Sequence, residues 1–207
     1  METLSQKNNI KNTIINSLNK ALSYPEYRTL TEDLVLKNST SGNEKTEALA
    51  AYTVLNNRRM KRWDKTLKIS EAEKNRILSF KGNVIWLVIT ESWCGDAAHV
   101  IPVLNKIAEL SDNIDLKLVF RDDNEELMNH FLTNGGKAIA KLIMIDKKSN
   151  EVLETFGPRP SEATKLVEDY KNEHGKLTPE FKERLQLWYN KDKGQNVILD
   201  ILDLLKV

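Results

Sequence analysis

The side chain with the clearest capacity for chemistry is Cys94, the only cysteine among the 207 residues. It follows a short apolar run over residues 84–89 and precedes a helical pattern, which predicts a turn from strand to helix. A thiol at a helix N-terminus gains from unpaired backbone N–H groups and from the helix dipole, and both lower its pKa. The sequence therefore predicts a reactive thiol at Cys94.

Two further features bear on this thiol. Asp96 disfavours the thiolate if it is ionised and close to the sulfur, or it favours the helix as a first-turn residue, and the sequence leaves both roles open. Because the chain holds no second cysteine, a mixed disulfide on Cys94 would have to be released by another thiol. We expect that thiol to come from glutathione or from a protein thiol or disulfide partner, and we expect no bound cofactor.

Polar residues follow the second predicted strand, residues 114–120. A right-handed helical crossover would make this strand parallel to the first one, so that both strands end at one edge of the sheet beside Cys94. An antiparallel strand would begin at the same edge. The binding residues expected there are Arg121, Asp122, Asp123, Ile139 and Ala140. The charged ones either line a polar pocket with Asp96 or are solvated loop charges, with Asp123 or Asn124 capping the next helix.

The three histidines are weaker candidates. His99, His130 and His174 are scattered and, with one cysteine, form no recognisable zinc site, so no metal is expected. His99 lies five residues beyond Cys94, so on a helix its side chain points about 140° away from the thiol. It is therefore a poor general base for Cys94 and is expected to be a surface or partly buried histidine.

Composition limits the classes of function. Hydrophobic residues make up 40% of the chain and charged residues 29%, which is typical of a soluble globular protein. A formal net charge of +1 gives no field that would draw the chain to nucleic acid or to an anionic membrane. The densest basic patch, residues 58–62, is accordingly expected to be a solvated helix end.

The cellular location follows from the same kind of argument. Residues 1–7 show no signal-peptide pattern, and no apolar run approaches the roughly 20 residues of a membrane-spanning helix. A single cysteine excludes an intrachain disulfide framework and favours a reducing compartment. We expect a cytoplasmic protein, and the sequence does not indicate an oligomeric state.

The elements that position Cys94 follow from hydrophobic periodicity and from capping signals. Strands are predicted at residues 83–90, 114–120, 139–145 and 152–156, with helices near 100–108, 127–132 and 163–170 between and after them. Helical patterns flank this region on both sides. On the N-terminal side they are predicted at 10–22, ending near Tyr24-Pro25, at 27–34, and after two capping boxes, Ser41/Glu44 and Ser70/Glu73. On the C-terminal side one helix is predicted to begin at Thr178-Pro179 and another to cover 197–205.

This order of strands and helices over residues 83–171 resembles the thioredoxin fold. Trp93-Cys94-Gly95 resembles the start of the thioredoxin active site, and Pro102 falls where thioredoxins carry a proline that kinks the following helix. The resemblance implies an α/β protein with a four-stranded mixed sheet and flanking helices, plus N-terminal and C-terminal helical extensions. The expected division is 1–70 for the first extension packed on the core, 71–174 for the thioredoxin-like domain and 175–207 for the C-terminal helices. The long flanks resemble a bacterial thioredoxin-like family of unassigned function.

The sequence departs from the thioredoxin pattern at two positions. Ala97 stands where thioredoxins carry the second cysteine, which excludes a dithiol cycle. Ala140 stands where they carry a cis-proline. Because a cis bond before a non-proline residue costs roughly 3 kcal/mol, we expect a trans bond before Ala140.

Two functions from different classes follow. The first is monothiol thiol–disulfide exchange, with Cys94 as the nucleophile and Trp93, Gly95 and Asp96 as its motif neighbours. The alternative is a non-catalytic thioredoxin-fold module that binds a protein or peptide partner at the same edge. Small-molecule binding at this edge is a third class. The sequence does not decide whether the chain is an enzyme.

Overall fold

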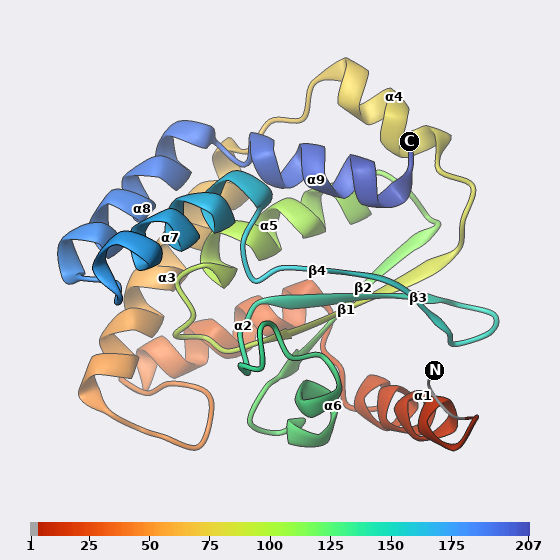
Figure 1. Cartoon of the computed structure of the whole chain (residues 1–207), viewed down its shortest axis with the longest axis horizontal. Coiled ribbons are helices and arrows are strands. Elements are labelled where there is room, and N and C mark those ends of the chain that lie inside the picture. The colour runs from red at the N-terminus through yellow and green to blue at the C-terminus, as the bar shows by residue number, and fades with distance from the viewer. Residues whose placement is uncertain (1–3) are drawn as a thin grey trace.

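The computed structural model describes residues 4–207, with side chains described from residue 8 onward. The prediction that residues 1–7 form no signal peptide concerns side chains that are not among those described. Figure 1 shows the arrangement of the elements. In chain order they are α1 (Leu4–Leu18), α2 (Tyr24–Leu36), α3 (Glu47–Thr66), α4 (Glu71–Ser79), β1 (Val84–Thr90), α5 (Ala97–Ala108), β2 (Ile114–Phe120), α6 (Glu125–His130), β3 (Lys141–Asp146), β4 (Val152–Phe156), α7 (Ser161–His174), α8 (Pro179–Asp192) and α9 (Gln195–Leu205).

The four strands form one mixed sheet in the order β2-β1-β3-β4. β1 and β2 are parallel and are joined through α5, whereas β3 is antiparallel to both β1 and β4. β1 is buried almost throughout, as its continuous apolar run predicts for a central strand. In Figure 1, α5 and α9 cover one face of the sheet, and α1, α2 and α6 cover the other. The predicted fold class is confirmed.

The main hydrophobic core joins the sheet to both extensions. Its buried members include Ile14 of α1, Tyr27 of α2, Met60 of α3 and Ile198 of α9, each at most 1% exposed. Burial of one large apolar side chain is worth about 1.5–3 kcal/mol, so these contacts hold the extensions firmly on the sheet. A second, smaller cluster packs α7 against α8. Within residues 4–207, no helix has the length and apolar character needed to cross a bilayer.

Two of the predicted helix starts are confirmed. The hydroxyl of Ser70 accepts from the backbone N–H of Glu73, whose carboxylate in turn accepts from the N–H of Ser70. This is the reciprocal capping box expected from the sequence. Thr178 caps α8 by accepting from the N–H of Phe181, with Pro179 at the first helical position.

Two other local predictions are wrong. The first helix ends at Leu18, well before Tyr24-Pro25, which instead open α2 behind the N-cap Ser23. A proline fits a first helical turn as well as it ends a helix, so its position alone is ambiguous. The Ser41/Glu44 capping box does not form, because Thr46 caps α3 and the Ser41 hydroxyl bonds to the buried carboxylate of Glu91.

Candidate functional site

Cys94 lies between the end of β1 and the start of α5, as its place in the sequence predicts. It is 7% exposed, and its thiol donates a hydrogen bond to the backbone carbonyl of Ile139 at 3.2 Å. The backbone N–H groups of Asp96 and Ala97 are directed at the sulfur. The expected contact with helix N-terminal amides is therefore present, but the sulfur is enclosed.

The pKa of this thiol contradicts the sequence-based expectation. Burial raises the pKa of Cys94 from 9.0 to about 12, and the negative charge of Asp96 adds to the rise. The amides of Ala97 and Asp96 act in the opposite direction but are outweighed. The prediction of a lowered pKa is wrong because it counted the helix terminus and not the loss of solvation, which is the larger effect for a fully buried group.

The peptide bond between Ile139 and Ala140 is cis, so the prediction of a trans bond is wrong. That prediction used only the intrinsic preference of a non-proline bond. In the folded chain both residues are buried, and the Ile139 carbonyl faces the Cys94 thiol. The surrounding structure, which the local sequence does not describe, decides this geometry.

Asp96 forms the centre of a buried polar group. Its carboxylate pairs with Arg159 at 2.7 Å and accepts a hydrogen bond from the Tyr189 hydroxyl at 3.0 Å. Burial raises the pKa of Asp96, and the Arg159 guanidinium partly reverses this effect. Asp96 makes no side-chain capping bond to α5. Of its two expected roles, the structure supports the one in which Asp96 lies close enough to disfavour the thiolate.

His99 is fully buried, not at the surface. Its Nδ1 accepts a hydrogen bond from Trp63 Nε1 at 3.0 Å, so the ring proton is on Nε2, which faces Gln186 Oε1 at 2.8 Å. The imidazole stacks on Tyr189 with ring centroids 4.3 Å apart. Burial lowers the pKa of His99 to about 3. Both nitrogens are engaged away from the thiol, so His99 is a neutral structural residue rather than a base for Cys94.

A buried hydrogen-bond network holds the residues before Cys94. Ser92 exchanges hydrogen bonds with Ser41: its N–H donates to the Ser41 hydroxyl at 2.7 Å, and its own hydroxyl accepts from the Ser41 N–H at 3.0 Å. The side chain of Asn56 donates to the Ser92 carbonyl at 3.0 Å. Glu91, also fully buried, accepts from the backbone N–H of Asp122 at 3.0 Å. The N-terminal extension thus fixes the strand end that carries the thiol.

The residues of the predicted polar cluster after β2 lie in two different places in the structure. Arg121 pairs with Asp122 at 2.8 Å and lies over the Trp93 ring, 5.0 Å from its centroid, beside the Cys94 edge. The N–H of Asn43 and the Arg121 guanidinium lower the pKa of Asp122 against the opposing effect of its partial burial. Asp123 lines a different cavity, against α2 and β2. Neither Asp123 nor Asn124 caps α6 through its side chain.

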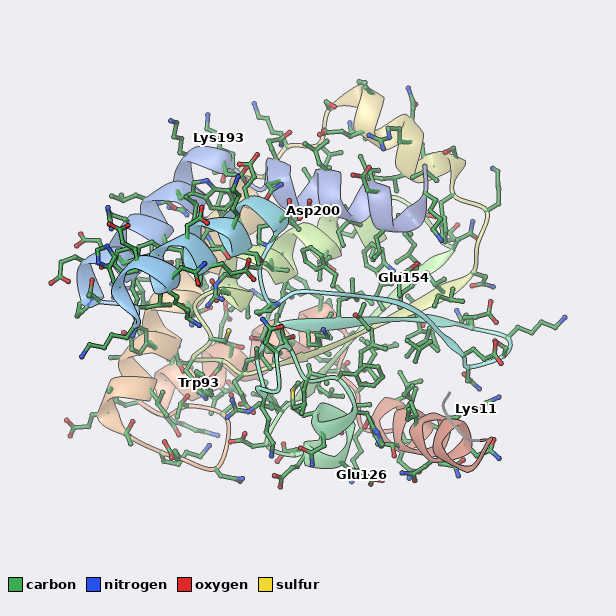
Figure 2. The ribbon with its side chains drawn as sticks, viewed as in Figure 1. Lys11, Trp93, Glu126, Glu154, Lys193 and Asp200 are labelled. Carbon is green, nitrogen blue, oxygen red and sulfur yellow. The ribbon has the colours of Figure 1, made fainter. Side chains whose placement is uncertain are left out.

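A cleft of about 840 Å³ opens at this edge of the sheet. Its lining includes Cys94, Gly95, Asp96 and Ile139, whereas Ala140 is buried and does not line it. Figure 2 shows Trp93 on the side of the sheet toward α3. Other wall residues include Arg59 of α3 in the first extension, Lys171 of α7 in the thioredoxin-like domain and Lys182 of α8 in the C-terminal helices.

The sequence reasoning missed these wall residues. They lie tens of residues away from Cys94, and nothing in their local patterns links them to it. Arg59 belongs to the basic patch that was expected to be a solvated helix end, and it is half-buried here. Within the part of the chain that the structure describes, no cluster of histidine, cysteine, aspartate and glutamate could hold a metal ion.

Comparisons with known proteins agree with the fold. A family model described as thioredoxin matches residues 42–171, which is more than half of the chain. The matched region includes α3 as well as the sheet, and it contains the Trp93-Cys94-Gly95 motif. No curated protein matches the chain.

Two solved structures share the fold. An HIV epitope-scaffold is 21% identical, with a TM-score of 0.55, and the alignment covers 76% of this chain and 90% of the scaffold. A protein of unknown function, PA1234 from Pseudomonas aeruginosa, is 18% identical, with a TM-score of 0.56. That alignment covers 89% of this chain and 98% of the other. At these identities the likeness concerns the fold alone.

Proposed function

Since the chain belongs to the thioredoxin family over residues 42–171, we propose that it is a non-catalytic thioredoxin-fold module that binds a protein or peptide partner. The partner occupies the cleft at the Cys94 edge. One observation carries the proposal: the Cys94 thiol is buried, 7% exposed, and donates to the Ile139 carbonyl, and this burial raises its pKa to about 12. At pH 7 such a thiol is almost entirely protonated, and the thiolate is the nucleophile.

Three contacts support the same conclusion. The thiol proton is engaged by the Ile139 carbonyl, Asp96 repels a thiolate, and His99 has both nitrogens committed elsewhere. A cysteine that acts as a nucleophile instead needs a lowered pKa or an adjacent base. The cleft beside the sulfur, in contrast, is open and lined by polar and apolar side chains, as binding sites commonly are.

Monothiol exchange remains the rival, because the amides of Asp96 and Ala97 are directed at the sulfur. In that reaction the Cys94 thiolate attacks a disulfide, one sulfur leaves as a thiolate, and a mixed disulfide forms. An external thiolate such as glutathione then attacks the mixed disulfide and releases Cys94. The first step requires the Cys94 thiolate, and the second requires that the external thiolate can reach the mixed disulfide at Cys94.

An insulin-reduction assay with glutathione as the reductant separates these functions. We expect the native chain and Cys94→Ser to give the same rate as glutathione alone, because the buried thiol does not ionise. A rate of insulin reduction that rises with the native chain and not with Cys94→Ser would contradict the proposal and favour the monothiol enzyme.

Alkylation by iodoacetamide tests the thiol itself. A pKa of about 12 in place of 9.0 predicts a thiolate population, and hence a rate below pH 9, about 1,000-fold lower in the folded chain. The matched control is the same chain unfolded in urea, whose thiol is solvated. A folded-chain pKa at or below the free value of about 8.5 would contradict the proposal.

A further inference from the structure

The cleft carries an excess of positive charge that the whole chain does not have. Its basic residues are Arg59, Arg121, Lys137, Arg159, Lys171 and Lys182. Its acidic residues are Asp96 and Glu183. The formal net charge of the chain is only +1, so this concentration of cations is local to the cleft. Cations gathered in a concave, partly desolvated surface attract anionic ligands more strongly than the same charges spread over a flat surface.

Three of the six cations are already paired. Arg159 pairs with Asp96, Arg121 with Asp122, and Lys137 with Glu125. Among the side chains described from residue 8 onward, no carboxylate lies within ion-pair distance of the other three, Arg59, Lys171 and Lys182. The unpaired cations come one each from α3, α7 and α8, so they face the cleft from different elements.

Arg59 is the most informative of these. Its guanidinium is half-buried and donates to the side chain of Asn56 at 3.0 Å, a neutral partner. Burial lowers the pKa of Arg59, and the nearby charge of Arg62 lowers it further. Arg59 and Gln186 lie beside Gly95: a Cβ there would be in ordinary van der Waals contact, 3.7 Å from Arg59 Nη1 and 3.9 Å from Gln186 Nε2. A partly desolvated cation that lines the cleft and has no described carboxylate within ion-pair distance is a position that an incoming carboxylate would stabilise.

The shape of the cleft favours a chain over a compact small molecule. A second cavity of about 380 Å³ shares Leu49, Trp93, Arg121 and Lys137 with the first one. Together the two exceed the range of about 300–1,000 Å³ that is usual for single small-molecule pockets. In the second cavity Arg121 pairs with Asp122 and Lys137 with Glu125, and Glu44 adds a further carboxylate. The exposed ring of Tyr52 lines the first cavity, and the ring of Trp93 lines both. An occupant that runs along both cavities would meet unpaired cations at one end, and paired charges, the carboxylate of Glu44 and apolar groups at the other.

We propose that the cleft binds an extended acidic peptide segment of a partner protein, whose carboxylates pair with Arg59, Lys171 and Lys182. The inference rests on the proposed function, because it names the class of partner for that binding module. The site requires α3 of the first extension, α7 of the thioredoxin-like domain and α8 of the C-terminal helices, since each supplies one of these cations. The thioredoxin-like sheet edge alone would not carry this charge.

Selection from a phage-displayed library of random dodecapeptides on the full native chain tests the inference. The recovered sequences are expected to be enriched in aspartate and glutamate over lysine and arginine. A selected peptide, made synthetically with a fluorescent label, is expected to bind about tenfold more weakly to Arg59→Gln/Lys182→Gln than to the native chain. The matched control is Lys81→Gln/Lys191→Gln, which removes two cations outside the cleft and is expected to bind as the native chain does.

The outcomes are separable from those of the thiol experiments. A selection without acidic enrichment, an empty selection, or equal loss of affinity in both double variants overturns the inference. Displacement of the peptide by millimolar inorganic phosphate or succinate at matched ionic strength assigns the cleft to small anions and also overturns it. Cys94 can prove inert while no acidic peptide binds, in which case the proposed function survives without this inference. A reactive Cys94 contradicts the proposed function whatever the peptide result.

Discussion

Cys94 and Arg59 lie at the same edge of the sheet and differ in almost every physical respect. The Cys94 thiol is enclosed and hydrogen-bonded to the Ile139 carbonyl, and the group remains protonated. The Arg59 guanidinium is half-buried, charged, open to the cleft and without a carboxylate partner among the described side chains. A sequence motif identifies Cys94 as a candidate site residue, whereas only the three-dimensional structure identifies Arg59.

The difference shows how the extensions change this edge. α8 places Tyr189 against Asp96 and Gln186 against His99, and the loop before α3 bonds to Glu91 and Ser92. These contacts give the polar groups around the sulfur partners within the protein. The cations that the same extensions add at the cleft, Arg59 and Lys182, are left for a ligand, as is Lys171 of the domain. Experiments on the two groups should therefore give opposite results for stability and for binding.

The largest effect on stability is expected from Asp96→Ala. Its removal leaves the mostly buried guanidinium of Arg159 unpaired and takes an acceptor from the Tyr189 hydroxyl. Loss of one partner of a buried pair costs about 3 kcal/mol in the free energy of unfolding, measured by urea denaturation. The surface variant Glu71→Ala, which breaks the exposed pair with Lys74, should cost less than about 0.5 kcal/mol. Equal losses in the two variants would show that the Asp96 pair is not effectively buried.

A smaller effect is expected from the pH dependence of His99. Burial lowers its pKa from 6.5 to about 3 in the folded chain, so the unfolded chain binds the proton more readily. The resulting stability is present above pH 6.5 and is lost as the pH falls toward 3. The loss between pH 6.5 and pH 5 should be on the order of 2 kcal/mol. His99→Gln should flatten this part of the urea-derived curve, and His130→Gln should not; a slope unchanged by His99→Gln would refute this assignment.

The smallest effect on stability is expected from Arg59→Gln. Because no described carboxylate pairs with Arg59, its removal should change the free energy of unfolding by less than about 0.5 kcal/mol in urea denaturation. Relief of the repulsion from Arg62 would act in the stabilising direction. A loss near that of Asp96→Ala would mean that Arg59 serves the fold, and the contrast between the two groups would then fail.

Several parts of the structure could be predicted from local patterns. The apolar run of β1, the alternation in β2 and the Ser70/Glu73 capping box each depend on residues a few positions apart. The parallel pairing of β1 and β2 then follows from the right-handed crossover through α5. The failed Ser41/Glu44 capping box shows the limit of such patterns. The Ser41 hydroxyl had a local partner available, but it bonds to Glu91, 50 positions away.

The sequence alone therefore determined the order of the elements, the fold class and the place of Cys94 between β1 and α5, because these depend on periodicity and on short-range backbone preferences. Only the tertiary structure decided the state of that thiol and the charge of the cleft. Solvation and Coulomb interactions depend on what lies within a few ångströms in space. Arg159, Tyr189 and Lys182 reach this edge from sequence positions that no local pattern connects to residue 94.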